Sequence, residues 1–222
     1  YLPDNMKVIT TSGKIFTCAW MLMGFENFCM SLITNPGLVQ RVFDKVGEVQ
    51  YKVLERVLEH DVVKGVWMPD DIAYSEALMI SPQYLRKYLF PWYKKFSQTC
   101  KQLDLPFIYH SDGTIWEVLD DLIDCGFNAL HPIEPKAMNI NEVKDKARGK
   151  LCIIGNLDLG YTLTRGTPEE VIAETKERIS YLAPGGGYCV SGSNSIPSYV
   201  PLENYKAMLQ TTFDYGKYPI NI

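Results

Sequence analysis

Short apolar segments alternate with amphipathic segments along almost the whole chain. The clearest amphipathic segment is residues 36–59, where valines recur every three or four residues and mark one buried helical stripe. Asn35 before Pro36 is a typical helix start, because a capping side chain precedes a proline at the first helical position. We therefore predict a helix over residues 36–59, preceded by apolar, partly β-branched stretches at 8–11 and 17–23.

Further strand-and-helix units follow. The predicted strands are apolar throughout rather than alternating, which is typical of a parallel sheet covered by helices. Pro91 lies inside the helix that Ser81 and Pro82 open, and it should kink or split that helix. Thr167 and Glu170 have the spacing of a capping box. The predicted strands cover residues 65–68, 106–109, 127–130, 151–154 and 188–190, and the predicted later helices cover residues 115–125, 139–147, 167–182 and 201–215.

Six β/α units in series are compatible with a doubly wound sheet or with a closed barrel. The glycine-rich stretches do not follow the GxGxxG order after a first strand, so a dinucleotide-binding fold is poorly supported. A (β/α)8 TIM barrel usually needs about 250 residues, and only six units are visible in 222. We predict one α/β domain over residues 1–222, of the TIM-barrel type and lacking two units.

Composition narrows the class of protein. The formal net charge of -4 gives no reason to expect nucleic acid or an anionic membrane as a partner. No apolar run approaches the ~20 residues that span a bilayer, and the N-terminus does not resemble a signal peptide. The six cysteines form no CxxC pair, so we expect reduced, mostly buried thiols in a cytoplasmic protein, with Cys189 packed in the core.

Polar residues follow most of the predicted strands. Each one alone is typical of a helix cap or a turn, but five of six strands ending this way favours a shared site, since catalytic groups of such folds lie at the carboxyl ends of strands. His110 and Asp112 are two residues apart and can face one centre, as metal ligands or as an acid/base pair. Glu134 could supply a third ligand. The strand-end residues are Asp70, Asp71, His110, Asp112, Glu134, Asn156, Asp158 and Asn194.

Four stretches resemble the uroporphyrinogen decarboxylase superfamily. They are Pro69–Ala73 followed by Ile80–Pro82, Tyr109–Gly113, the Gly-Asn-Leu-Asp sequence at 155–158, and Gly186–Tyr188 continuing to 201–204. The resemblance covers nearly the whole chain and begins at the family's third strand. It implies a barrel without the first two β/α units, which in the decarboxylases hold the tetrapyrrole.

The resemblance implies a methyltransferase branch that passes a methyl group from a methoxylated or methylamine-type small molecule to a corrinoid protein. Its zinc-binding members have a His-x-Cys motif where this chain reads His110-Ser111-Asp112, and a later cysteine where it has Asn194. Both cysteines are absent, which argues against activation of a thiol such as coenzyme M. We expect zinc on His110 and Glu134, with Asp112 either as a further ligand or in support of one, and a corrinoid carried by a partner protein. The expected catalytic residues are Asp71, Asp112 and Asp158, and the expected substrate-binding residues are Tyr109, Asn156 and Asn194.

Two alternatives remain open. A true uroporphyrinogen decarboxylase needs a basic pocket for the carboxylates of its substrate, and Arg165 is one candidate for it. A barrel relative that binds a ligand or a corrinoid partner without turnover is the other. The sequence does not determine the oligomeric state.

Overall fold

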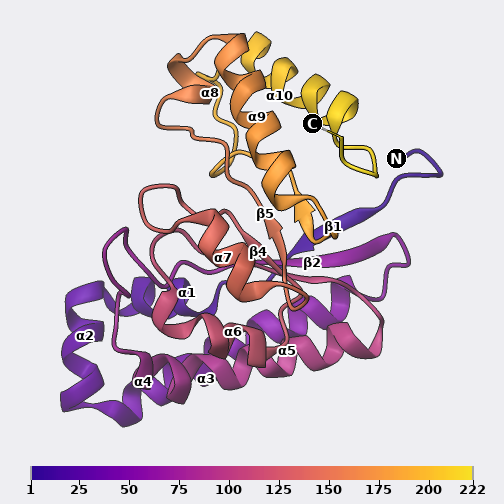
Figure 1. The fold of residues 1–222 in the computed structure, drawn as a ribbon. Coiled ribbons are helices and arrows are strands. Elements are labelled where there is room, and N and C mark those ends of the chain that lie inside the picture. Colours follow the sequence, from indigo (N-terminus) through magenta and orange to yellow (C-terminus); the bar gives the residue numbers. More distant parts are fainter. Residues whose placement is uncertain (1, 222) are drawn as a thin grey trace. The chain divides into compact units, whose positions relative to one another are not determined.

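The computed structural model describes residues 2–221 and shows an α/β protein with six parallel strands (Figure 1). The chain divides into two compact units, residues 1–129 and 130–222, and each is described by itself. The single domain expected over residues 1–222 therefore stays a prediction. The series of six β/α units is confirmed in outline by the order of the elements.

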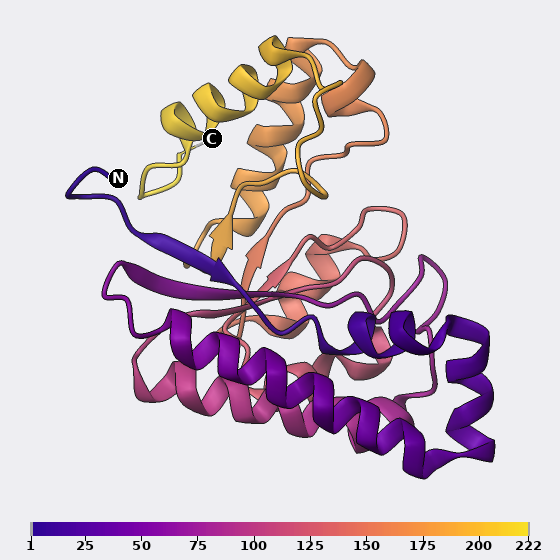
Figure 2. The ribbon, with the colours of Figure 1, turned by 180° about the vertical axis from the view of Figure 1, so that it is seen from behind.

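The first unit contains three complete strands and, among the described residues, the longest helix. β1 pairs with β2 and β2 pairs with β3, in both cases parallel. Helices α3 and α5 lie side by side along these strands (Figure 2). Its elements are β1 (Val8–Thr11), α1 (Ile15–Met23), α2 (Phe25–Thr34), α3 (Pro36–Val57), β2 (Val63–Pro69), α4 (Pro82–Tyr84), the π-helix η1 (Leu85–Leu89), α5 (Phe90–Gln102), β3 (Phe107–His110), the 3-10 helix η2 (Trp116–Val118) and α6 (Leu119–Cys125).

Local signals explain α3 well. The Asn35 side chain accepts a hydrogen bond from the backbone N–H of Leu38 at 3.2 Å, as its capping position predicts. The buried side of α3 includes Phe43, whose ring packs against Phe28 from α2 and stacks on Tyr88 from η1. This aromatic cluster holds the helices against one another.

The segment after β1 differs from a simple strand-and-helix order. The apolar stretch at 17–23 lies in helix α1, and α2 follows it after a 93° bend at Gly24, where φ is +74°. Among residues 2–221, no single helix is long and apolar enough to cross a membrane, and α1 and α2 satisfy that criterion only as a bent pair.

The predicted break near Pro91 is confirmed, because the helix runs as a π-helix immediately before α5.

β4 (Ala129–His131) begins with the last residue of the first unit and continues into the second. In the second unit, β5 pairs parallel with β6. Helices α9 and α10 pack against each other (Figure 1), and the capping box at the start of α9 is confirmed, because Thr167 and Glu170 exchange both expected hydrogen bonds. The remaining elements are α7 (Ile140–Ala147), β5 (Cys152–Ile154), α8 (Thr162–Arg165), α9 (Pro168–Leu182), β6 (Tyr188–Cys189) and α10 (Leu202–Tyr215).

The expectation of mostly buried thiols is wrong. Cys100 and Cys125 are buried, as expected for structural thiols, whereas Cys18, Cys29 and Cys152 are half-buried. The expectation that Cys189 packs in the core is wrong, because its side chain is exposed. β6 has only two residues, and Cys189 is the exposed one at its end.

Candidate functional site

Three of the predicted site residues come together in the first unit. Nε2 of His110 lies 3.8 Å from Oδ1 of Asp71 and 4.0 Å from Oδ1 of Asp112. The His110 side chain is 14% exposed, whereas those of Asp71 and Asp112 are 47% and 38% exposed. The imidazole is therefore mostly enclosed, and the two carboxylates form the side of the cluster that faces solvent.

Strand register brings these residues together. Pro69 of β2 pairs with His110 of β3, so Asp71 and Asp112 each lie two residues beyond a paired position. The backbone N–H of Asp112 donates to Oδ1 of Asp71 at 3.0 Å. The indole of Trp67 lies 6.2 Å from the His110 ring and packs beside it. The pairing of two strand ends thus fixes the separation of the two carboxylates.

The loop after His110 is held by a buried serine and a glycine. Oγ of Ser111 accepts from the backbone N–H of Ile72 at 3.1 Å and donates to the Asp112 carbonyl oxygen at 2.9 Å. Gly113 has a φ of +82°, and a Cβ there would lie 2.4 Å from the carbonyl oxygen of Tyr74. Only glycine allows this close approach, which fixes the backbone that carries Asp112.

The donor set fits a divalent ion that prefers nitrogen and oxygen ligands. One imidazole nitrogen and one oxygen from each carboxylate lie within 4.8 Å of one another. Ligand atoms about 2.0–2.1 Å from a tetrahedral ion are about 3.4 Å apart, so the side chains would need to close by up to about 1.4 Å. The set contains no thiolate, so it is a hard-to-borderline site rather than a soft one.

Asp70 is a functional carboxylate that sequence reasoning passed over in favour of its neighbour. Its Oδ2 accepts from the backbone N–H groups of Ile15 and Phe16 and from the Tyr93 hydroxyl, at 2.9, 2.8 and 3.0 Å. Its Oδ1 accepts from the N–H and the hydroxyl of Thr17, at 2.8 and 2.9 Å. Asp70 therefore caps the N-terminus of α1, whose own N-cap residue makes no side-chain cap.

Burial dominates the electrostatics of this carboxyl group. Asp70 is completely buried, and burial raises its pKa from 3.8 to about 6, against the hydrogen bonds from Thr17, Phe16 and Tyr93, which lower it. Tyr109, an expected substrate-binding residue, lies in the same network, and its hydroxyl donates to the Asp70 carbonyl oxygen at 2.8 Å. Burial raises the pKa of Tyr109 well above its ordinary value of 10.0, so its hydroxyl stays protonated.

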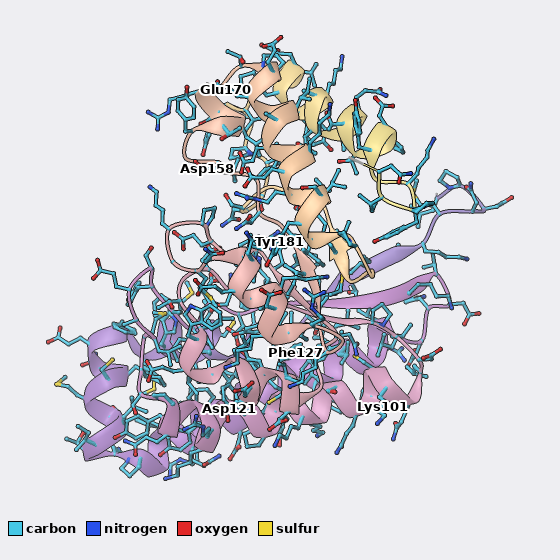
Figure 3. All side chains as sticks on the ribbon, viewed as in Figure 1. Lys101, Asp121, Phe127, Asp158, Glu170 and Tyr181 are labelled. Atoms are coloured by element: carbon cyan, nitrogen blue, oxygen red, sulfur yellow. The ribbon has the colours of Figure 1, made fainter. Side chains whose placement is uncertain are left out.

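The other predicted residues lie in the second unit. Asn156 is buried, donating from Nδ2 to the Ile133 carbonyl oxygen at 2.7 Å and accepting from Nε of Arg178 at 3.1 Å. Asp158, labelled in Figure 3, lies between β5 and α8 and accepts from the N–H groups of Gly160 and Tyr161 at 2.7 and 3.1 Å. These contacts match the turn-forming alternative for Asp158.

Asn194 and Glu134 complete the predicted set. Oδ1 of Asn194 accepts from the backbone N–H of Ser195 at 2.7 Å. Glu134 is half-buried just beyond β4. The roles predicted for Glu134, Asn156, Asp158 and Asn194 stay predictions. The cluster itself adds Asp71 as a candidate ligand beside His110.

Comparison with known proteins assigns the chain to a family. The sequence profile described as uroporphyrinogen decarboxylase (URO-D) matches residues 1–215. The chain belongs to the uroporphyrinogen decarboxylase family. This family member shares its fold with a methyltransferase from Methanosarcina mazei, with a TM-score of 0.81 and 21% identity, over 97% of this chain and 61% of that one.

Curated relatives of this family member are similar over only part of their length. A methylcobamide:CoM methyltransferase, MtaA, of Methanosarcina barkeri is 30% identical over 219 residues, which cover 96% of this chain and 59% of the relative. MtbA of Methanosarcina acetivorans, another methylcobamide:CoM methyltransferase, is 28% identical over 83% of this chain and 52% of the relative. The chain thus spans between half and three-fifths of the length of these relatives.

Proposed function

We propose that this chain is part of a corrinoid-dependent methyltransferase that moves a methyl group from a methoxylated or methylated small molecule to a corrinoid protein. The similarity to two methylcobamide:CoM methyltransferases supports the corrinoid partner. The observation that carries the direction of transfer is the Asp71–His110–Asp112 cluster, which offers one nitrogen and two carboxylate ligands.

The chemistry of these ligands favours an oxygen or nitrogen substrate over a thiol. A soft sulfur substrate is best activated at a centre with soft thiolate ligands. The cluster has an aspartate at position 112, not a cysteine. A methyl ether or a methylamine presents a hard oxygen or nitrogen to the protein. An ion that prefers the nitrogen and oxygen ligands of the cluster also prefers the oxygen or nitrogen atom of such a substrate.

Each residue of the cluster has a defined task in this proposal. Asp71, His110 and Asp112 would hold a divalent ion such as zinc, which when bound supplies Lewis acidity toward the atom that carries the methyl group. Trp67 fixes the imidazole plane from the side, and the exposed carboxylate faces of Asp71 and Asp112 leave the cluster open to substrate. Gly113 and Ser111 hold the loop, so the cluster is preorganised before substrate binds.

The direction of transfer is tested on the full-length protein with two assays. Methylation of cob(I)alamin is measured with a methoxylated aromatic compound and with a methylamine, and demethylation of methylcobalamin is measured with coenzyme M. We expect the first activity, reduced by about 100-fold or more in His110→Ala and unchanged in His60→Ala, a surface histidine after α3. Coenzyme M-dependent demethylation as the main activity would reverse the proposed direction.

Metal analysis is the second test. We expect about one divalent ion per chain in the purified full-length protein, lost in His110→Ala and kept in His60→Ala. A folded, metal-free protein that still methylates cob(I)alamin would contradict the role of the cluster. Conversion of uroporphyrinogen III to coproporphyrinogen without methyl transfer would replace the proposal with decarboxylation, the activity for which the family is named.

A further inference from the structure

Two cysteines on neighbouring strands of the second unit face each other. Sγ of Cys152 on β5 and Sγ of Cys189 on β6 are 3.8 Å apart. Cys152 is half-buried and Cys189 is exposed, so solvent and small ions reach the pair. The pair does not involve the candidate ligands of the first unit, and the methyl-transfer proposal makes no use of it.

The strand register disfavours a disulfide between them. Cys189 pairs with Ile154, so Cys152 is displaced by two residues along β5 from the position opposite Cys189. With strands about 4.8 Å apart and a rise of about 3.3 Å per residue, this offset places the two Cα atoms about 8 Å apart. Disulfides usually need Cα atoms within about 6.8 Å and sulfur atoms about 2.05 Å apart. Oxidation would therefore require the strands to shift.

The distance between the two sulfur atoms matches that between two thiolates bound to one metal ion. Two thiolates about 2.3 Å from one tetrahedral ion lie about 3.8 Å from each other, which needs no movement of either strand. We propose that Cys152 and Cys189 form a two-thiolate site for a thiophilic cation of the zinc and cadmium class. Such ions have filled d shells and a preference for sulfur, and solvent would complete the coordination at the exposed side.

One neighbouring charge favours an ionised sulfur atom at Cys152, against the burial that disfavours it. Lys144 is buried, and its Nζ donates to the carbonyl oxygens of Gly186 and Gly187 at 2.6 and 2.8 Å, which fixes a positive charge near Cys152. A cavity of about 410 Å³ beside Cys152 gives solvent access to its sulfur, while its basic lining supplies no further cation ligand. It is lined by Lys144, Arg148, Gly149, Lys150, Leu151, Cys152 and residues 184–187.

The protonation states give the balance of the binding step. The hydrogen bond with Cys152 lowers the pKa of Cys189, and that same contact, with burial, raises the pKa of Cys152. Binding of one divalent cation forms two metal–sulfur bonds, and each sulfur that still carries a proton releases it to solvent.

The remaining cysteines provide matched controls. Burial raises the pKa of both Cys100 and Cys125 to about 12, so neither is a ready ligand. Cys29 is half-buried on α2, and burial raises its pKa as well. Cys29→Ser therefore removes an accessible thiol without touching the pair.

The test uses cadmium with the reduced full-length protein in a His110→Ala background, so that the candidate site of the first unit does not contribute. Calorimetry and the ultraviolet cadmium–thiolate absorption should show one ion bound per chain. Affinity should fall by about 100-fold or more in Cys152→Ser and in Cys189→Ser and stay unchanged in Cys29→Ser. Equal affinity and absorption in the Cys152→Ser/Cys189→Ser double variant would overturn the proposal.

A second measurement needs no variant of the pair. Cadmium should protect Cys189 from alkylation in the reduced protein, as read by peptide mass spectrometry, while Cys29 continues to react. Unchanged alkylation of Cys189 in saturating cadmium would count against the site. Rapid, quantitative formation of a Cys152–Cys189 disulfide under mild oxidation would also overturn it, because that product requires the strand geometry that the register disfavours.

Discussion

Replacing Asp70 with asparagine removes the carboxylate that caps the start of α1 while keeping the size of the side chain. Five donors converge on this carboxylate, yet burial still raises its pKa from 3.8 to about 6. In the unfolded chain the carboxyl group has its ordinary value. The folded protein therefore holds the Asp70 proton over a range of pH where the unfolded chain has already lost it.

The sign of the effect on stability follows from this difference. Because the folded state binds more protons between pH 3.8 and about 6, the contribution of Asp70 to the free energy of unfolding is complete below 3.8 and falls as the pH rises through that window. At ~1.4 kcal/mol for each pH unit, the window corresponds to about 3 kcal/mol. The advantage of the wild type over Asp70→Asn should shrink by about that amount between about pH 3.5 and about pH 7.

Urea denaturation of the wild type, Asp70→Asn and Asp71→Asn at a series of pH values measures this directly. Asp71 is the neighbouring carboxylate, its side chain is 47% exposed, and Asp71→Asn is the control for loss of a carboxylate at this strand end. A wild-type advantage over Asp70→Asn that grows as the pH rises would refute the reasoning. It would mean that the five hydrogen bonds outweigh burial and hold the folded pKa of Asp70 below 3.8.

Two further stability predictions follow from backbone geometry. Gly113→Ala should lower the free energy of unfolding by about 3 kcal/mol, since its Cβ would meet the Tyr74 carbonyl oxygen at 2.4 Å. Gly185 has nearly the same φ but nothing within 4 Å of its Cβ position, so Gly185→Ala should cost only about 1 kcal/mol. Equal losses in thermal unfolding would contradict the steric argument. Thr167→Ala should cost about 1 kcal/mol by breaking the capping box with Glu170, and urea denaturation that shows no loss would exclude that role.

The sequence predicts best those features whose causes are local. Asn35 and Thr167 each cap a helix that begins at the next residue, so the signal and its effect lie together in the chain. Helix α1 was not expected as a helix, because its cap comes from Asp70, 53 to 55 residues further along. The meeting of Asp71 with His110 follows from the strand-end rule, but their separation depends on a register that no local pattern encodes.

The alternating direction of side chains in extended backbone separates residues that lie at the same strand end. Asp70 and Asp71 are adjacent, yet one binds the start of α1 and the other lies beside the imidazole. Tyr109 and His110 divide in the same way, with the tyrosine in the buried network and the histidine in the cluster. Neighbouring side chains of extended backbone point to opposite sides, and applying that rule at the strand ends would have separated these pairs.

The adjacency of Asp70 and Asp71 has a consequence for laboratory evolution. A single peptide link joins the anchor of α1 to the ligand cluster, so a substitution at Thr17 changes the support of Asp71 without contacting it. Effects at Thr17 and His110 should therefore be epistatic rather than additive. A library built on the cluster gains more from varying Thr17 together with it than from varying the cluster alone.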